Sequence, residues 1–202
     1  MSRTIQEIRE QFSKDSTEIL IGYQDTLAAI KAKGQPEEGG YLDRLSDEQR
    51  MGLMREQKME QAQEAVSQAR EEYTAEVSRY REDLARRTNY IREHLFKVED
   101  AGALSRAALA TDAELGTLME LAAQASNAEL GRAAFVAAEQ RGLGDLMAAY
   151  FDRIDPEARE FYQEWTEIPP QEILDRQAES VERLLPGPTP EELMQGNLAA
   201  AW

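Results

Sequence analysis

The chain has 202 residues, of which 42% are apolar and 31% are charged, so it has room for one or two domains and an apolar core. The absence of cysteine excludes disulfides and thiolate metal sites. The net charge of −16 is uneven, because residues 101–202 carry 7 basic and 18 acidic side chains. A surface this acidic repels a phosphate backbone, so we expect no direct binding of nucleic acid.

The N-terminal residues, MSRTIQEIRE, lack the apolar core of a signal peptide. No stretch approaches the roughly 20 apolar residues of a membrane span. We therefore expect a soluble, cytoplasmic protein with no membrane partner, free or incorporated into a virion or another large assembly.

Glycines and prolines divide the chain into helical segments, and no run alternates with the period of a strand. We expect an all-α fold: a long coiled-coil-like helical hairpin, a small C-terminal helical domain and a terminal docking helix. The predicted parts are an N-terminal helix at 1–33, a hinge at 34–45, a long helix at 46–100, a helical domain at 101–185 and a proline-tethered helix at 186–202.

Both long helices carry an apolar stripe with an eleven-residue repeat, which packs nearly straight helices. In the first helix the stripe is Ile5, Ile8, Phe12, Ser16, Ile19, Tyr23, Leu27 and Ile30. In the second it is Val66, Ala69, Tyr73, Val77, Tyr80, Leu84, Thr88, Ile91 and Leu95. If the first helix folds back from the hinge, it covers only about thirty residues of the second, at 1.5 Å per residue. Residues 77–98 then need another cover.

That cover is either the C-terminal domain or a second copy of the protein, because an exposed apolar strip of this length is unusual in a monomer. We favour a homo-oligomer. The residues expected to mediate self-association are Val66, Tyr73, Val77, Tyr80, Leu84, Ile91 and Leu95.

The predicted helical domain contains an internal duplication, in which TDAELGTLMELAAQ (111–124) aligns with SNAELGRAAFVAAE (126–139). Each copy predicts one helix opened by a capping box, Thr111 with Glu114 and Ser126 with Glu129. The equivalent glycines, Gly116 and Gly131, suggest close helix crossings. Capping side chains also precede prolines at Asp155 and Thr189.

An aromatic segment follows, in which apolar residues recur at three- and four-residue steps. This spacing predicts the inward face of a helix rather than a ligand pocket, which is the alternative. The residues are Phe151, Ile154, Ala158, Phe161, Trp165 and Ile168.

The sequence shows no catalytic, cofactor-binding or metal-binding pattern, so we expect no enzyme and no cofactor. His94 is the only histidine, and it cannot supply the two Glu-x-x-His units of a di-metal site. No nucleophile elbow or Walker A loop is present, and GLGD (142–145) lacks the rest of a dinucleotide fingerprint. The arginines are interleaved with acids at pairing distance, which favours a salt-bridged helix over a phosphate site. They are Arg79, Arg81, Arg86, Arg87 and Arg92.

The last segment, PGPTPEELMQGNLAAAW, begins with three prolines in five residues and then predicts a short amphipathic helix. Met194, Leu198 and Trp202 share one face, which suits docking into a partner's groove. The alternative is that this helix packs back onto its own chain.

In outline this acidic, cysteine-free helical chain resembles assembly and connector proteins of tailed phages, although no diagnostic motif is involved. The resemblance implies a non-catalytic structural or assembly protein that self-associates and docks at least one protein partner. One alternative is an acidic inhibitor or regulator of a nucleic-acid-binding protein. A less favoured alternative is an enzyme with an unrecognised helical active site.

Overall fold

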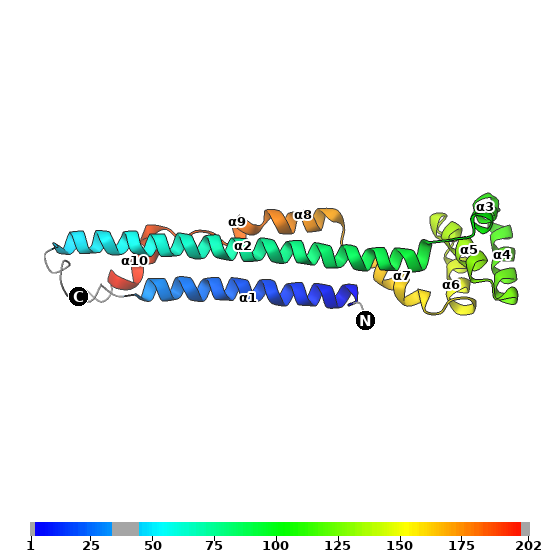
Figure 1. Cartoon of the computed structure of the whole chain (residues 1–202), viewed down its shortest axis with the longest axis horizontal. Helices are drawn as coiled ribbons and strands as arrows, with labels where there is room; N and C mark the ends of the chain where they lie inside the picture. The colour runs from blue at the N-terminus through cyan, green and yellow to red at the C-terminus, as the bar shows by residue number, and fades with distance from the viewer. Residues whose placement is uncertain (1–2, 34–44, 199–202) are drawn as a thin grey trace. The chain divides into compact units, whose positions relative to one another are not determined.

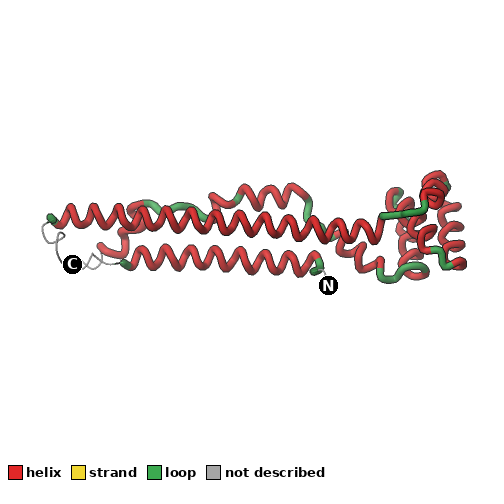
Figure 2. Tube along the Cα trace, viewed as in Figure 1, coloured by secondary structure: helices red, strands yellow, loops and turns green. Residues whose placement is uncertain are grey.

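The computed structural model describes residues 3–33 and 45–198, with side chains to Gln195. The described chain is all-α, with no strand (Figures 1 and 2). It divides into two compact units. The domain unit comprises residues up to Ile8 with Glu82–Pro169, and the hairpin unit comprises Arg9–Arg81 with the chain from Pro170 onward.

In the hairpin unit, α1 (Ile5–Ala32) runs antiparallel to α2 (Asp47–Phe96) (Figure 1). The Phe12 ring stacks on Tyr80 at 4.4 Å and meets Tyr73 edge-on at 6.4 Å. Near the other end of α1, the carbonyl of Lys31 accepts a hydrogen bond of 2.8 Å from the buried Lys58 side chain. A lysine donor at the end of a helix satisfies a carbonyl that has no partner within the helix.

This register corrects the expected coverage of α2. We predicted that α1 would cover only about the first thirty residues of the second helix and leave residues 77–98 open. That prediction was wrong, because the end of α1 lies opposite Lys58 rather than opposite the start of α2. The whole contact is therefore shifted along α2, and Phe12 reaches Tyr80.

The chain from Pro170 onward packs on the same hairpin. It forms α8 (Gln171–Glu179), α9 (Val181–Leu184) and α10 (Pro190–Leu198). Three side chains of the hairpin donate to its main chain: Arg81 to the Leu174 carbonyl at 2.6 Å, Arg70 to the Leu185 carbonyl at 3.1 Å, and Tyr23 to the Pro186 carbonyl.

Apolar anchors complete this attachment. Leu185, Leu193 and Met194 are buried, and Leu193 packs in one cluster with Ile30 and Ala62. The terminal helix was expected to stand apart from the fold, but the structure makes its described part a component of the hairpin core. The reason is Leu193, which the predicted apolar face did not include.

In the domain unit, short helices surround α5 (Ala128–Gln140). It packs against α3 (Ala101–Leu109), α4 (Asp112–Ala125) and α6 (Gly144–Arg153), and α7 (Ala158–Thr166) follows. The duplicated segments form α4 and α5. Ile154 lies so close to Gly131 that a Cβ there would be 2.9 Å from its side-chain carbons, which confirms a close approach at this glycine.

The predicted helix starts met different outcomes. Thr111 and Glu114 form the expected capping box, and so do the side chain and backbone contacts between Thr189 and Glu192. Ser126 does not cap α5. It ends α4 in the left-handed conformation, with φ of 51°, and Asn127 caps α5 instead through a 3.0 Å bond to the Leu130 amide.

The core of the domain unit is aromatic. Phe135 stacks on Tyr150 at 4.7 Å and contacts Phe151 at 5.3 Å, while Phe96 meets Trp165 edge-on at 5.0 Å. Burial, reinforced by the charge of Asp155, raises the pKa of Tyr150 to about 12. Of the predicted inward face, Phe151 and Ala158 are buried and the other four side chains are half-buried.

Candidate functional site

The residues predicted to mediate self-association are all buried within the single chain. Their exposed fractions are 8% or less. The four in the hairpin unit are Val66, Tyr73, Val77 and Tyr80, and the three in the domain unit are Leu84, Ile91 and Leu95. The structure therefore gives all seven a packing role inside the folded chain.

In the domain unit, α7 supplies contacts to the last turns of α2. Phe161 meets Tyr90 at 5.8 Å and the exposed His94 at 5.0 Å. The C-terminal domain was one of the two covers predicted for this part of the stripe, and α7 provides such a cover within one chain. His94 lies at the edge of the stripe as expected, with its Nδ1 2.9 Å from the Tyr90 carbonyl.

A buried ion pair joins α2 to α7. Arg87 contacts both carboxylate oxygens of Glu164, at 2.9 Å and 2.5 Å. Glu164 Oε2 also accepts the amide hydrogen of Ile5, at 3.2 Å, and this amide belongs to the first residue of α1. The guanidinium carbon lies 5.1 Å from the centre of the Tyr90 ring. Every strong partner of Arg87 is internal, so this arginine has a structural role.

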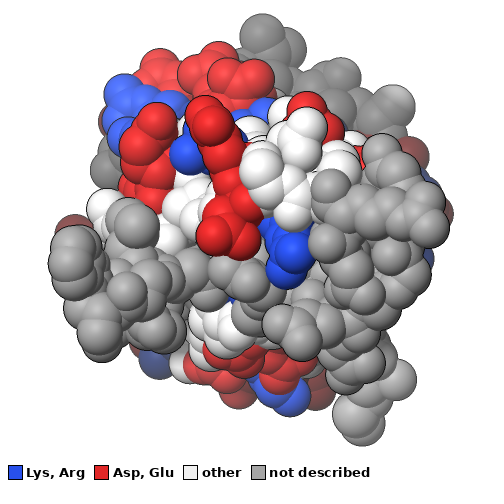
Figure 3. Space-filling view, turned by 90° about the vertical axis from the view of Figure 1, so that its left-hand side faces the viewer, with Lys and Arg blue, Asp and Glu red and all other residues white. Residues whose placement is uncertain are grey.

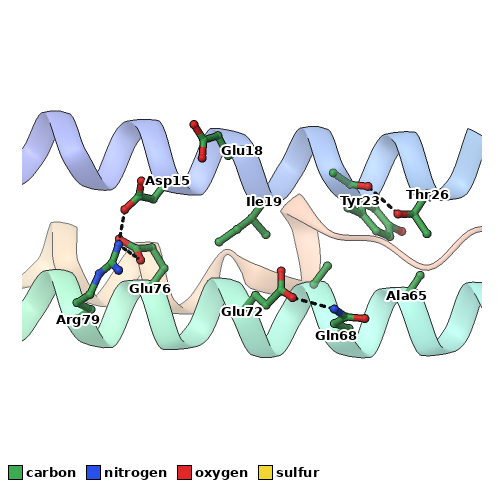
Figure 4. Close-up of a pocket in the computed structure, with 12 residues that line it drawn as sticks. Asp15, Glu18, Ile19, Tyr23, Thr26, Ala65, Gln68, Glu72, Glu76 and Arg79 are labelled. Atoms are coloured by element: carbon green, nitrogen blue, oxygen red, sulfur yellow. Dashed lines mark hydrogen bonds and ion pairs between the residues drawn. The ribbon is translucent and has the colours of Figure 1, made fainter.

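A cleft of about 560 Å³ lies between α1 and α2 in the hairpin unit (Figure 4). It exists because small residues face each other there, namely Gly22, Ala65 and Ala69. A Cβ placed on Gly22 would meet nothing within 4 Å. Ile19 projects between the two helices without filling the space.

The polar groups of this cleft pair with one another. Arg79 lies between Asp15 and Glu76, and these carboxylates, Glu76 above all, raise the pKa of the arginine. Gln68 donates to Glu72 at 2.9 Å (Figure 4). Carboxylates outnumber arginine here, yet the buried one, Glu76, already has its partner. The arrangement is that of an ion-paired hairpin flank.

The described arginines of the predicted group are likewise engaged by acids. Arg81 pairs with Asp175 at 3.1 Å and Arg86 with Asp83 at 2.5 Å, while Arg87 and Arg79 have the partners given above. Arg92 lies 6.0 Å from the Trp165 ring centre. The predicted pairing of these arginines with carboxylates is thus present for four of the five.

A second hollow, the α3–α4 groove, lies in the domain unit and has a volume of about 470 Å³. It is lined by Arg106, Leu109, Ala110, Glu114, Thr117 and Leu118. Leu109 is 87% exposed, and Leu121, one turn beyond Leu118 on α4, is 49% exposed. Sequence analysis missed this surface, although the alignment of the duplicated segments already paired Leu118 and Leu121 with smaller residues.

The residues predicted for partner docking are only partly described. Met194 is 5% exposed and lies in the hairpin unit. The Leu198 side chain and Trp202 lie outside the described residues. Docking through Met194 would require this side chain to leave the hairpin core.

Comparisons with protein-family models, curated proteins and solved structures found no match to this chain. None of the helices described here combines the length and apolar content that a bilayer crossing requires. Among the same residues, no cluster of three or more histidine and acidic side chains is arranged to hold a metal ion.

Proposed function

We propose that this chain is a non-catalytic structural or assembly protein that associates with itself and with other proteins, as phage virion assembly and connector components do in outline. One observation carries the proposal. The long stripes are already filled by the chain's own helices, and yet Leu109 and Leu121 remain exposed beside the half-buried Leu118 on the domain unit. Apolar side chains gathered on one face favour a protein contact.

Self-association through the seven stripe residues would first require the folded chain to open. Tyr80, for example, would lose its stack on Phe12. Burying large apolar side chains contributes about 1.5–3 kcal/mol each, and this stabilisation is lost whenever they are exposed. Association through a face that is already exposed carries no such cost, and we therefore place the oligomer contact outside the stripe.

Light scattering at protein concentrations from about 1 to 200 μM tests the proposal, since affinities in the micromolar range correspond to roughly −8 kcal/mol. We expect the mass to rise above that of the 22.8 kDa monomer as concentration increases. A constant monomer mass over this range would contradict self-association.

A second candidate function is that of an acidic inhibitor or regulator of a nucleic-acid-binding protein. The specific observation is the charge of residues 101–202, with 18 acidic and 7 basic side chains and no lysine. On the coloured part of the face drawn in Figure 3, however, acidic side chains lie beside basic ones. Binding to a basic nucleic-acid-binding domain that weakens steeply between about 50 and 200 mM salt would favour this candidate, because such contacts are screened.

A further inference from the structure

We infer that the α3–α4 groove is the contact through which two copies of this chain associate, with the same groove used on both copies. The inference rests on the proposed self-association and assigns it to particular residues. The contact lies entirely within the domain unit.

The first argument comes from the duplicated helices. In the gapless alignment, Leu118 and Leu121 of α4 correspond to Ala133 and Val136 of α5. The α5 residues are buried, at 0% and 8% exposure, because α5 is packed on several sides by its neighbours. The α4 residues are larger and remain open. The same helical register thus buries its apolar side chains in one copy and lacks a covering element in the other.

The second argument concerns charge. Arg106 on α3 and Glu114 on α4 line the groove together with the leucines. The Arg106 guanidinium is exposed and has no ion-pair or hydrogen-bond partner among the residues the structure describes. A chain with a net charge of −16 repels its own copies over most of its surface. This groove is different because it offers one charge of each sign around an apolar centre.

These features make the groove self-complementary. In a two-fold contact the same patch faces itself, so a residue of one copy meets a different residue of the other, and the pairing occurs twice. Arg106 of each copy can then meet Glu114 of the other while Leu109, Leu118 and Leu121 are covered between them. A partner of strongly basic or strongly acidic character would leave one of the two charges opposed.

The experiment measures oligomer mass by light scattering and sedimentation for the full chain and its variants. The double variant Leu109→Glu/Leu121→Glu should weaken association at least tenfold. Leu104→Glu is the matched control, because Leu104 is also an exposed leucine of α3 but does not line the groove. It should leave the association constant within about twofold. Circular dichroism verifies that each variant keeps its helix content.

A charge exchange between two chains tests the pairing itself. Arg106→Glu and Glu114→Arg should each weaken association, because like charges then meet twice in each symmetric dimer. An equimolar mixture of the two variants should associate again. In the mixed dimer, position 106 of each chain faces a charge of opposite sign at position 114 of the other, in both halves of the contact. Loss of the Thr111 capping box in Glu114→Arg does not affect this comparison, because the same chain is present before and after mixing.

The outcomes separate the two proposals. An oligomer that is unaffected by the groove substitutions, or a mixture that stays as weak as its components, overturns the groove assignment and leaves self-association standing. A wild-type chain that remains monomeric throughout the concentration range overturns both.

Discussion

Arg87 of α2 and Glu164 of α7 form a two-pronged ion pair whose side chains are 8% and 16% exposed. The same carboxylate accepts the first amide of α1 through Ile5, so one acidic side chain connects three helices of the domain unit. Removing one partner of a buried pair leaves the other charge without compensation, which is costly.

We therefore expect Glu164→Ala to lower the free energy of unfolding by about 3 kcal/mol, near the lower end of the effect for buried pairs because Glu164 keeps some exposure. The double variant Arg87→Met/Glu164→Leu should lose less than Glu164→Ala alone, since it leaves no unpaired charge. Urea unfolding monitored by circular dichroism measures both. Equal losses for the single and double variants would show that the charge itself is unimportant.

The packing of α10 predicts that the terminal segment stabilises the hairpin. Leu193 is 1% exposed and packs with Ile30 and Ala62, so Leu193→Ala should cost about 2–4 kcal/mol. Leu184→Ala is the control, because this leucine is among the exposed ones and its loss should cost less than about 1 kcal/mol. Thermal and urea unfolding supply the comparison. If Leu193→Ala is as mild as the control, the tail is not part of the core.

Two glycines predict opposite effects of the same substitution. A Cβ on Gly131 would lie 2.9 Å from two carbons of Ile154, so Gly131→Ala should destabilise the domain unit by about 1–3 kcal/mol. A Cβ on Gly52, within α2, would meet nothing within 4 Å. Gly52→Ala should therefore stabilise the chain by about 0.5–1 kcal/mol, because alanine has the higher helix propensity. Melting temperatures that move in the same direction for both variants would contradict the packing described at Gly131.

The capping box of α4 predicts a specific dependence on pH. Hydrogen bonds from the backbone and side chain of Thr111 lower the pKa of Glu114 below its ordinary value of 4.5. A carboxyl group with a lowered pKa in the folded state stabilises the fold above its unfolded pKa, and this contribution is lost as the pH falls through the folded pKa. The stability difference between the wild type and Glu114→Gln should thus be largest at neutral pH and shrink below about pH 4.5.

Urea unfolding of the two proteins at several values between pH 3 and pH 7 measures this difference. Glu120→Gln is a suitable control, since Glu120 is another exposed acid of α4 that is not part of the capping box. A difference for Glu114→Gln that does not change with pH would show that the capping carboxylate contributes nothing through its charge.

The stripe was predictable because helical periodicity alone decides which side chains can face a neighbouring helix. Of the predicted stripe of α2, every residue except Thr88 is buried. The identity of the cover was not predictable from the same pattern. It depends on the register of α1 against α2, and the contact between Lys31 and Lys58 that reports this register joins residues with no distinguishing local signal.

Local capping was predictable only where the motif had no competitor. Thr111 succeeds as a cap because no other hydrogen-bonding side chain adjoins it at the start of α4. At the next helix, Ser126 and Asn127 are adjacent, and both residue types are good caps. Asn127 takes the position, and Glu129 accepts hydrogen from the Glu99 amide at 2.7 Å instead of completing a box with Ser126. The α3–α4 groove escaped prediction because it is formed by two helices whose placement depends on α5.

Arg81, Arg70 and Tyr23 fasten the segment after Pro170 by its carbonyl oxygens, a group that every amino acid carries. Substitution at Leu174 or Pro186 therefore removes no acceptor, whereas substitution at any of the three donors removes a tether. Across variants of this chain, sequence drift should consequently be tolerated more readily at those two tail positions than at Tyr23, Arg70 and Arg81. The grip is inherited through the hairpin, and the part being gripped is freer to change.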